Sequence, residues 1–192
     1  MRKATIERRT NETDIQLTLN LDGNQNISVN TKVPFFDHML TLFAFHGKFD
    51  LNITCDGDIE VDDHHTVEDV GLVLGAALYK ALGDKVGIYR YGASLLPMDE
   101  SLARVVIDIN NRPVLVYRNP LTRERLGTMD TQNVQEFFKS VVTASKITLH
   151  AEVLYGDNEH HRVEALFKAF GKALRQATHV EGDIVMSTKG VL

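Results

Sequence analysis

A motif that occurs twice constrains the fold of this chain more than any other feature. His64-His65-Thr66-Val67-Glu68 is repeated as His160-His161-Arg162-Val163-Glu164, with the two copies 96 residues apart in a chain of 192. Six residues after each copy the identity resumes, and the matching pairs are Gly75 and Gly171, Ala77 and Ala173, and Leu78 and Leu174. A repeat at half the chain length predicts two similar half-domains, each carrying one copy of the motif.

The composition is typical of a globular protein without a nucleic-acid or membrane partner. Hydrophobic residues make up 43% of the chain and the net charge is -5, so the chain can bury a core and has no dominant basic face. The N-terminus lacks the apolar region of a signal peptide, and no apolar stretch reaches the roughly 18 residues of a membrane span. A single cysteine, Cys55, excludes an internal disulfide framework. We therefore expect a cytoplasmic protein.

Hydrophobic spacing and turn residues predict the elements of the first half. They are strands over residues 13–20 and 26–32, a helix over 35–46, a strand over 50–54 and a long helix over 64–82. Asp22-Gly23 lies between the first two strands and predicts a hairpin. Asp62 or Asp63 is expected to cap the long helix, and Gly83 to end it.

The second half repeats this order of elements. Strands are expected over residues 102–109 and 114–118, a helix over 131–146, a strand over 147–154 and a second long helix over 160–178, while residues 83–97 join the halves. We predict an α+β fold in which each half is a β-sheet with two helices on one face. The whole chain, 1–192, is expected to form one catalytic domain with pseudo-repeats over approximately 1–92 and 93–192.

Each copy of the motif places metal-binding side chains on one helical turn. Glu68 follows His65 by three residues and His64 by four, so its side chain shares a helix face with both. The two histidines themselves point about 100° apart, which favours binding to different ions. A duplication gives no packing reason to keep two histidines and a glutamate together. The repeat therefore predicts two metal ions.

Two further positions fit the doubling. His38 and Glu136 are each expected in the helix that precedes the His-His helix of its own half. The predicted metal ligands, four from each half, are His38, His64, His65, Glu68, Glu136, His160, His161 and Glu164. Imidazole and carboxylate donors without a thiolate favour Mn, Fe or Zn, and a site with room for substrate favours Mn or Fe.

Three other histidines allow several interpretations. His46 is expected to contact a substrate or to cap its helix. His150 is a candidate for a further ligand, for a hydrogen-bond partner of the ligands, or for a core residue. His179 is expected to be exposed to solvent.

These motifs resemble those of the imidazoleglycerol-phosphate dehydratase family. The segments that carry the resemblance are Phe36-Asp37-His38-Met39, residues 63–69, residues 160–169 and Ser187-Thr188-Lys189-Gly190. The resemblance covers essentially the whole chain and shows no sign of an extra phosphatase domain, as expected for the monofunctional form. The resemblance implies a ribosomal S5 domain 2-like fold and the conversion of D-erythro-imidazole-glycerol phosphate to imidazole-acetol phosphate in histidine biosynthesis. It also implies two Mn ions per active site and a homo-oligomer, in which trimers with metal sites at subunit interfaces form a 24-subunit octahedral cage.

The resemblance further implies roles for individual residues. Seven of the eight predicted ligands match the family, whereas many members have a histidine where this chain has Glu136, itself a competent ligand. Glu12 is the implied acid and base, with Glu68 and Glu164 as alternative bases. The implied substrate contacts are Glu12, His46, Arg90, Arg112, Ser187, Thr188 and Lys189, of which the arginines, Ser187 and Lys189 would bind the phosphate.

The expected chemistry has a physical reason to use two ions. The proton that the substrate loses lies on a carbon beside the imidazole ring and is barely acidic. Ions on both ring nitrogens would hold the ring as an imidazolate, which can expel the neighbouring hydroxyl and form a diazafulvene. The carbon acid then loses its proton more easily.

Two other interpretations stay open from the residues alone. A two-metal hydrolase would need ions roughly 3.5–4 Å apart, which the diverging adjacent histidines disfavour. A metal-storage or metal-nucleated structural shell would not need Arg90, Arg112 or the Lys189 tail.

Overall fold

The computed structural model describes residues 2–192 of the chain. Its elements, in chain order, are β1 (Lys3–Arg9), β2 (Thr13–Asn20), β3 (Ile27–Asn30), α1 (Pro34–Gly47), β4 (Asp50–Gly57), α2 (His64–Leu82), β5 (Tyr91–Met98), β6 (Ser101–Asp108), β7 (Val114–Arg118), β8 (Arg125–Leu126), β9 (Met129–Asp130), α3 (Gln132–Ser145), β10 (Thr148–Tyr155) and α4 (Glu159–Ala177). The predicted helices are confirmed, and the two long helices begin at or one residue before the repeated motif.

The two halves build sheets with the same strand order. The first sheet has the order β1-β2-β4-β3 and the second has the order β5-β6-β10-β7. In each sheet the last pair, β3 with β4 or β7 with β10, is parallel and the other pairs are antiparallel. This arrangement confirms the predicted α+β fold. The predicted repeat boundary near residue 92 falls within β5 and stays a prediction.

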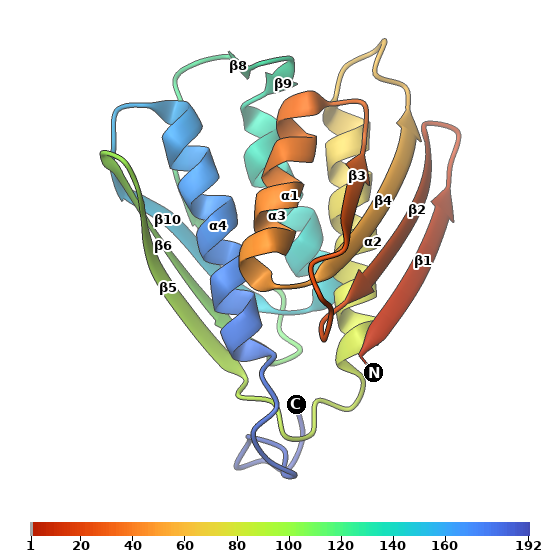
Figure 1. Cartoon of the computed structure of the whole chain (residues 1–192), viewed down its shortest axis with the longest axis vertical. Coiled ribbons are helices and arrows are strands. Elements are labelled where there is room, and N and C mark those ends of the chain that lie inside the picture. The colour runs from red at the N-terminus through yellow and green to blue at the C-terminus, as the bar shows by residue number, and fades with distance from the viewer. Residues whose placement is uncertain (1) are drawn as a thin grey trace.

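The four helices lie between the two sheets (Figure 1). Helices α1 and α2 cover the first sheet, and α3 and α4 cover the second. Within the helical layer, however, α1 packs along α4 and α2 packs along α3. Each helix therefore has its nearest helical neighbour in the other half of the chain.

Aromatic side chains from both halves form the centre of the core. The rings of Phe43 on α1 and Phe170 on α4 stack with their centroids 4.9 Å apart, and those of Phe137 and Phe167 stack at 5.1 Å. The inward faces of the strands supply alternating apolar residues, such as those of β2, in which every second side chain from Thr13 onward is buried. Burial of this apolar surface holds the helical layer against both sheets.

Two repeated glycines allow the helices to approach closely. A Cβ atom on Gly171 of α4 would lie 2.3 Å from the carbonyl oxygen of Phe43 on α1. A Cβ atom on Gly75 of α2 would lie 2.5 Å from the carbonyl oxygen of Val141 on α3. Backbone atoms would therefore block any side chain at either position, which explains why glycine recurs in both halves.

The hairpin predicted around Asp22-Gly23 is wrong. β2 pairs with β1 and β4, whereas β3 lies on the far side of β4 and pairs with it in parallel. The Asp50 carboxylate accepts hydrogen bonds from the backbone N–H groups of Asn24 and Asn26, at 2.7 and 2.9 Å. The loop after β2 is thus anchored to the beginning of β4 and carries the chain across it.

The edge strands β1 and β5 were not predicted from the sequence. Hydrophobic alternation is weak in both, because β1 buries only Ala4 and β5 exposes apolar residues such as Leu95. The joining segment predicted over 83–97 therefore contains most of β5. Within residues 2–192, no helix combines the length and apolarity that crossing a membrane requires.

Candidate metal centre and substrate site

Three predicted ligands converge where α1 packs against α4. The Nε2 atom of His160 lies 3.1 Å from Glu164 Oε2, and the Nε2 atom of His38 lies 3.6 Å from the same oxygen. One ligand atom from each of the three residues lies within 4.8 Å of the other two. This set of two imidazoles and one carboxylate fits a Mn, Fe or Zn ion. The cluster draws on both halves of the chain, because His38 comes from the first half and the others come from the second.

Glu164 is buried and ionised in this cluster. Lys168, one turn further along α4, places its Nζ atom 2.5 Å from Glu164 Oε1. Burial alone would raise the pKa of Glu164, but the hydrogen bond and charge of Lys168 outweigh it, and the pKa is lowered. Lys168 was not predicted as a site residue, although its i+4 spacing from Glu164 is visible in the sequence.

A second group lies where α2 packs against α3. The Nε2 atom of His64 lies 3.9 Å from Glu68 Oε2, and its Nδ1 atom lies 3.1 Å from the side-chain oxygen of Asn133. Glu136 and His64 line the same cavity of about 310 Å³. Glu136 forms an ion pair with Lys139 at 3.0 Å. The two groups are thus arranged alike, but the distance from the first histidine to the glutamate is longer in the second group, at 3.9 Å against 3.1 Å.

The adjacent histidines of each motif diverge, as predicted. The ring planes of His64 and His65 are inclined by 80° with centroids 6.0 Å apart, and those of His160 and His161 by 83° at 6.2 Å. His64 and His160 turn toward the neighbouring helix, whereas His65 and His161 face strand-end turns. The two imidazole rings of each motif therefore point to different places and could bind different metal ions.

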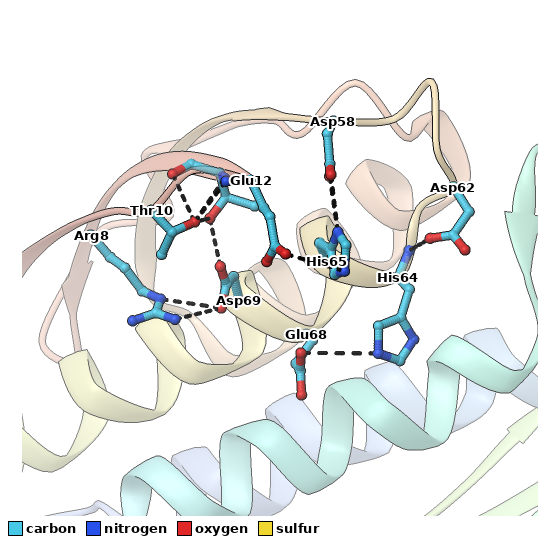
Figure 2. A network of polar contacts seen from close by, with 10 residues as sticks. Arg8, Thr10, Glu12, Asp58, Asp62, His64, His65, Glu68 and Asp69 are labelled. Atoms are coloured by element: carbon cyan, nitrogen blue, oxygen red, sulfur yellow. Dashed lines mark hydrogen bonds and ion pairs between the residues drawn. The ribbon is translucent and has the colours of Figure 1, made fainter.

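His65 lies between two carboxylates (Figure 2). Its Nδ1 atom is 3.0 Å from Asp58 Oδ2, and its Nε2 atom is 3.7 Å from Glu12 Oε1. The hydrogen bond with Asp58 raises the pKa of His65 above its usual value. Asp58 follows β4 directly and was not predicted as a site residue.

His161 has a similar environment in the second half. Its Nδ1 atom is 2.8 Å from Glu100 Oε2, and its Nε2 atom is 3.8 Å from Asp99 Oδ2. The hydrogen bond with Glu100 raises the pKa of His161. The same bond, together with a backbone N–H donated by Asn158, lowers the pKa of Glu100 to about 2.

A hydrogen-bond chain holds the turn that carries Glu12 (Figure 2). Arg8 donates two hydrogen bonds to Asp69 Oδ1, at 3.1 and 3.0 Å, and the Thr13 hydroxyl donates to Asp69 Oδ2 at 2.5 Å. The Thr10 hydroxyl oxygen accepts the backbone N–H of Glu12 at 3.1 Å. The turn is therefore anchored to α2 one residue after Glu68.

The predicted phosphate-binding residues gather at the end of the molecule where the C-terminus lies (Figure 1). Arg90 donates to both carboxylate oxygens of Asp108, at 2.7 and 3.1 Å, and to the carbonyl of Met186 at 2.8 Å. Asn111, which precedes Arg112, donates to the carbonyl of Leu192 at 2.9 Å. Residues 187–190 form a turn that includes Ser187, Thr188 and Lys189. The histidine motifs begin at the opposite end of the helices.

The remaining histidines lie apart from the ligand clusters. His46 is half-buried, and burial together with the charges of Lys168 and Lys172 lowers its pKa. His150 is exposed between buried neighbours of β10, on the face of the sheet that turns away from the helices, so it is not a core residue. His179 is exposed, as predicted.

Known proteins resemble this chain along its full length. The sequence model of the imidazoleglycerol-phosphate dehydratase family matches residues 31–174, which include both copies of the motif. An imidazoleglycerol-phosphate dehydratase from Bacillus cereus is 55% identical over 194 residues, with 100% of both proteins covered. One from Acetivibrio thermocellus is 54% identical, over 100% of this chain and 99% of that protein.

Solved structures show the same likeness. The crystal structure of imidazoleglycerol-phosphate dehydratase from Staphylococcus aureus matches with a TM-score of 0.85 at 41% identity, over 93% of this chain and 99% of that chain. The enzyme from Pyrococcus furiosus, solved in complex with (S)-C348, matches with a TM-score of 0.84 at 37% identity, over 97% of this chain and 100% of that chain. The similarity thus extends to both sheets and all four helices.

Proposed function

Because the chain belongs to the imidazoleglycerol-phosphate dehydratase family, and is thus a hydro-lyase of histidine biosynthesis, we propose that it works with two Mn ions per active site. In this reaction D-erythro-imidazole-glycerol phosphate loses water to give imidazole-acetol phosphate. The observation that carries the proposal is the convergence of His38, His160 and Glu164, since two imidazoles and a carboxylate suit Mn and leave coordination positions for a substrate.

The ligand clusters support a division of the donors between two ions. His38, His160 and Glu164 would contribute to one, and His64 and Glu68, with Glu136 across the cavity, would contribute to a second. His65 and His161 point elsewhere and would complete the sites of neighbouring subunits. When bound, the metals would stabilise the substrate ring as an imidazolate that can eliminate the hydroxyl through a diazafulvene.

Glu12 is the best placed acid and base among the proposed catalytic carboxylates. Its side chain is half exposed and lies 3.7 Å from His65 Nε2, on a turn that the Asp69 network holds in place. Glu164 is engaged by His160 and Lys168, so its carboxylate is better suited to hold a cation than to exchange protons. Glu68 would act mainly as a ligand of the ion at His64.

The separation of the predicted site residues supports an oligomer. The histidines lie at the beginning of α4, whereas Arg90 and the Ser187–Lys189 turn lie beyond its end. A helix of 19 residues is about 28 Å long, which is too far for one phosphorylated imidazole to span. We therefore propose that the tail of one subunit completes the site of another, within a cytoplasmic assembly of trimers that forms a 24-subunit cage.

A metal-dependence assay tests the proposed function. Protein stripped with a chelator should lose dehydration of imidazoleglycerol phosphate, and Mn should restore it while two ions bind per subunit. Elemental analysis and an assay of imidazole-acetol phosphate give the two measurements. The Glu12→Gln variant serves as a control, because it should bind Mn normally and still fail to dehydrate. Full activity in metal-free protein would exclude the Mn mechanism.

A further inference from the structure

Two turns in the two halves occupy equivalent places. Glu12 directly precedes β2, and Glu100 directly precedes β6. Both strands are the second in their sheets, and each pairs with the first strand of its half in the same antiparallel manner. Each turn also faces the second histidine of the motif in its own half, His65 or His161. Glu100 is therefore the structural counterpart of Glu12.

The two counterparts contact different nitrogens of their histidines. Glu12 lies 3.7 Å from Nε2 of His65, whereas Glu100 lies 2.8 Å from Nδ1 of His161. In the first half the Nδ1 position is already taken by Asp58, at 3.0 Å. Both histidines thus have a carboxylate at Nδ1, but it is contributed by different segments of the chain.

In the second half, the carboxylate at Nδ1 of the histidine comes from a different turn. Asp58 directly follows β4, and the residue that directly follows β10 is Gly156. A Cβ atom at Gly156 would lie 2.1 Å from the Ser101 hydroxyl, so a side chain at this position would clash, and the aspartate of this turn is the next residue, Asp157. The turn before β6 supplies the carboxylate instead.

Glu100 is held more firmly than Glu12. Its Oε1 atom accepts hydrogen bonds from the Ser101 hydroxyl at 2.9 Å and from the backbone N–H groups of Asn158 and Asp157, at 2.8 and 3.3 Å. Its Oε2 atom is left for His161. A carboxylate with both oxygens engaged is suited to orient a ring, whereas a free one is suited to exchange protons.

We propose that Glu100 and Asp58 are positioning residues, which accept Nδ1–H of His161 and His65 and leave each Nε2 atom unprotonated and directed outward as a metal ligand. A carboxylate at the second nitrogen of a ligating histidine sets its tautomer and its orientation. The duplicated turns have accordingly diverged: Glu100 orients a ligand, while Asp58 relieves Glu12 of that role and leaves it available for proton transfer. This inference rests on the proposed function, because it takes both histidines as metal ligands.

Substitutions at the two counterpart turns test the inference. Glu100→Ala should weaken Mn binding about tenfold to a hundredfold, as measured by the free Mn signal in electron paramagnetic resonance titrations. Glu100→Gln keeps an acceptor oxygen and should lose less affinity than Glu100→Ala. Glu12→Ala is the matched control, since it should abolish turnover while changing Mn affinity less than about twofold. Ser101→Ala removes one hydrogen bond to Glu100 and leaves the contact with His161 in place. Its melting temperature, followed by circular dichroism, is the control for effects on folding stability.

A metal-free measurement separates this inference from the proposed function. Solid-state NMR of the apo protein labelled with nitrogen-15 histidine should show His161 as the Nδ1–H tautomer, its signal identified by its loss in His161→Asn. If wild-type protein bound no Mn, the proposed function would fail, and the tautomer would still decide the role of Glu100. The inference would be overturned if both Glu100 variants bound Mn as tightly as the wild type, or if the Glu12 and Glu100 variants lost equal Mn affinity. An Nε2–H tautomer at His161 would overturn it as well.

Discussion

Among single residues, a buried charge distinguishes the first half from the second. Asp69 follows the proposed ligand Glu68, and the residue at the same place in the second motif is Ala165, a core residue. Asp69 is 5% exposed, and its carboxylate is stabilised by Arg8 and Thr13. A buried carboxylate costs free energy unless such partners compensate it. Its presence in the first half only agrees with a role in anchoring the Glu12 turn, since the counterpart turn is held through Glu100 by Ser101 and Asn158 instead.

The Asp69→Ala variant tests the strength of this anchor. It should lower the free energy of unfolding by about 1–3 kcal/mol, because the buried Thr13 hydroxyl and the Arg8 guanidinium lose their shared acceptor. Urea denaturation followed by circular dichroism measures the change. Asp183→Ala removes an exposed aspartate and is the control that should leave the unfolding free energy unaltered. Equal stability of the two variants would show that the network contributes little.

At the scale of elements, the pairing of helices across the halves assembles the ligand clusters. His38 reaches Glu164 because α1 lies against α4, and His64 reaches Asn133 because α2 lies against α3. The repeated glycines permit both approaches, since they bring one helix against the backbone of the other. The distance between paired helices therefore sets the distances between the proposed ligands that they carry.

Substitution of one glycine should disturb both properties together. In Gly171→Ala the added methyl group meets the Phe43 carbonyl at 2.3 Å, and backbone atoms cannot move aside as a flexible side chain could. We expect a loss of about 1–3 kcal/mol in stability, as for overpacked cores, and weaker Mn binding because His38 moves away from Glu164. Chemical denaturation and Mn titration provide the measurements. Gly182→Ala, at a position with open space around it, should match the wild type in both.

At the scale of the whole molecule, the chain carries its two kinds of site residue at opposite ends. The histidine motifs lie at the beginnings of α2 and α4, and the tail with Ser187 and Lys189 lies beside Arg90 at the far end (Figure 1). In the proposed assembly these ends meet between subunits. Substrate binding and metal binding should then respond to different parts of the chain.

Deletion of residues 187–192 separates the two kinds of binding. The truncated protein should bind Mn and assemble as the full chain does, because the metal ligands precede the tail, but it should lose affinity for the phosphorylated substrate. Steady-state kinetics, Mn titration and light scattering after gel filtration measure the three properties. Lys189→Ala should also weaken substrate binding, seen as a rise in KM, but by less than the truncation does. Unchanged turnover in the truncated protein would remove the tail from the phosphate site.

Local pattern and repetition were enough to predict the four helices, most of the strands and the donor residues of the motifs. Helical spacing predicts that Glu68 lies beside both histidines of its motif and that the two histidines diverge, because residues on a helix are related by a fixed angle. The structure confirms the divergence and places Glu68 3.9 Å from His64. The duplication and the α+β fold also followed from the chain, since both are properties of local pattern and of repetition. By contrast, the weakly patterned edge strands and the side of β4 on which β3 pairs could not be predicted.

Which residues meet across the halves became clear from the three-dimensional packing. The sequence left open which motif His38 joins, and the structure places it with His160 and Glu164 of the other half. Asp58 and Glu100 carry no recognisable motif, and their contacts with His65 and His161 depend on where two turns end in space. The physical reason is that helix pairing and turn placement result from long-range packing, which local periodicity does not encode.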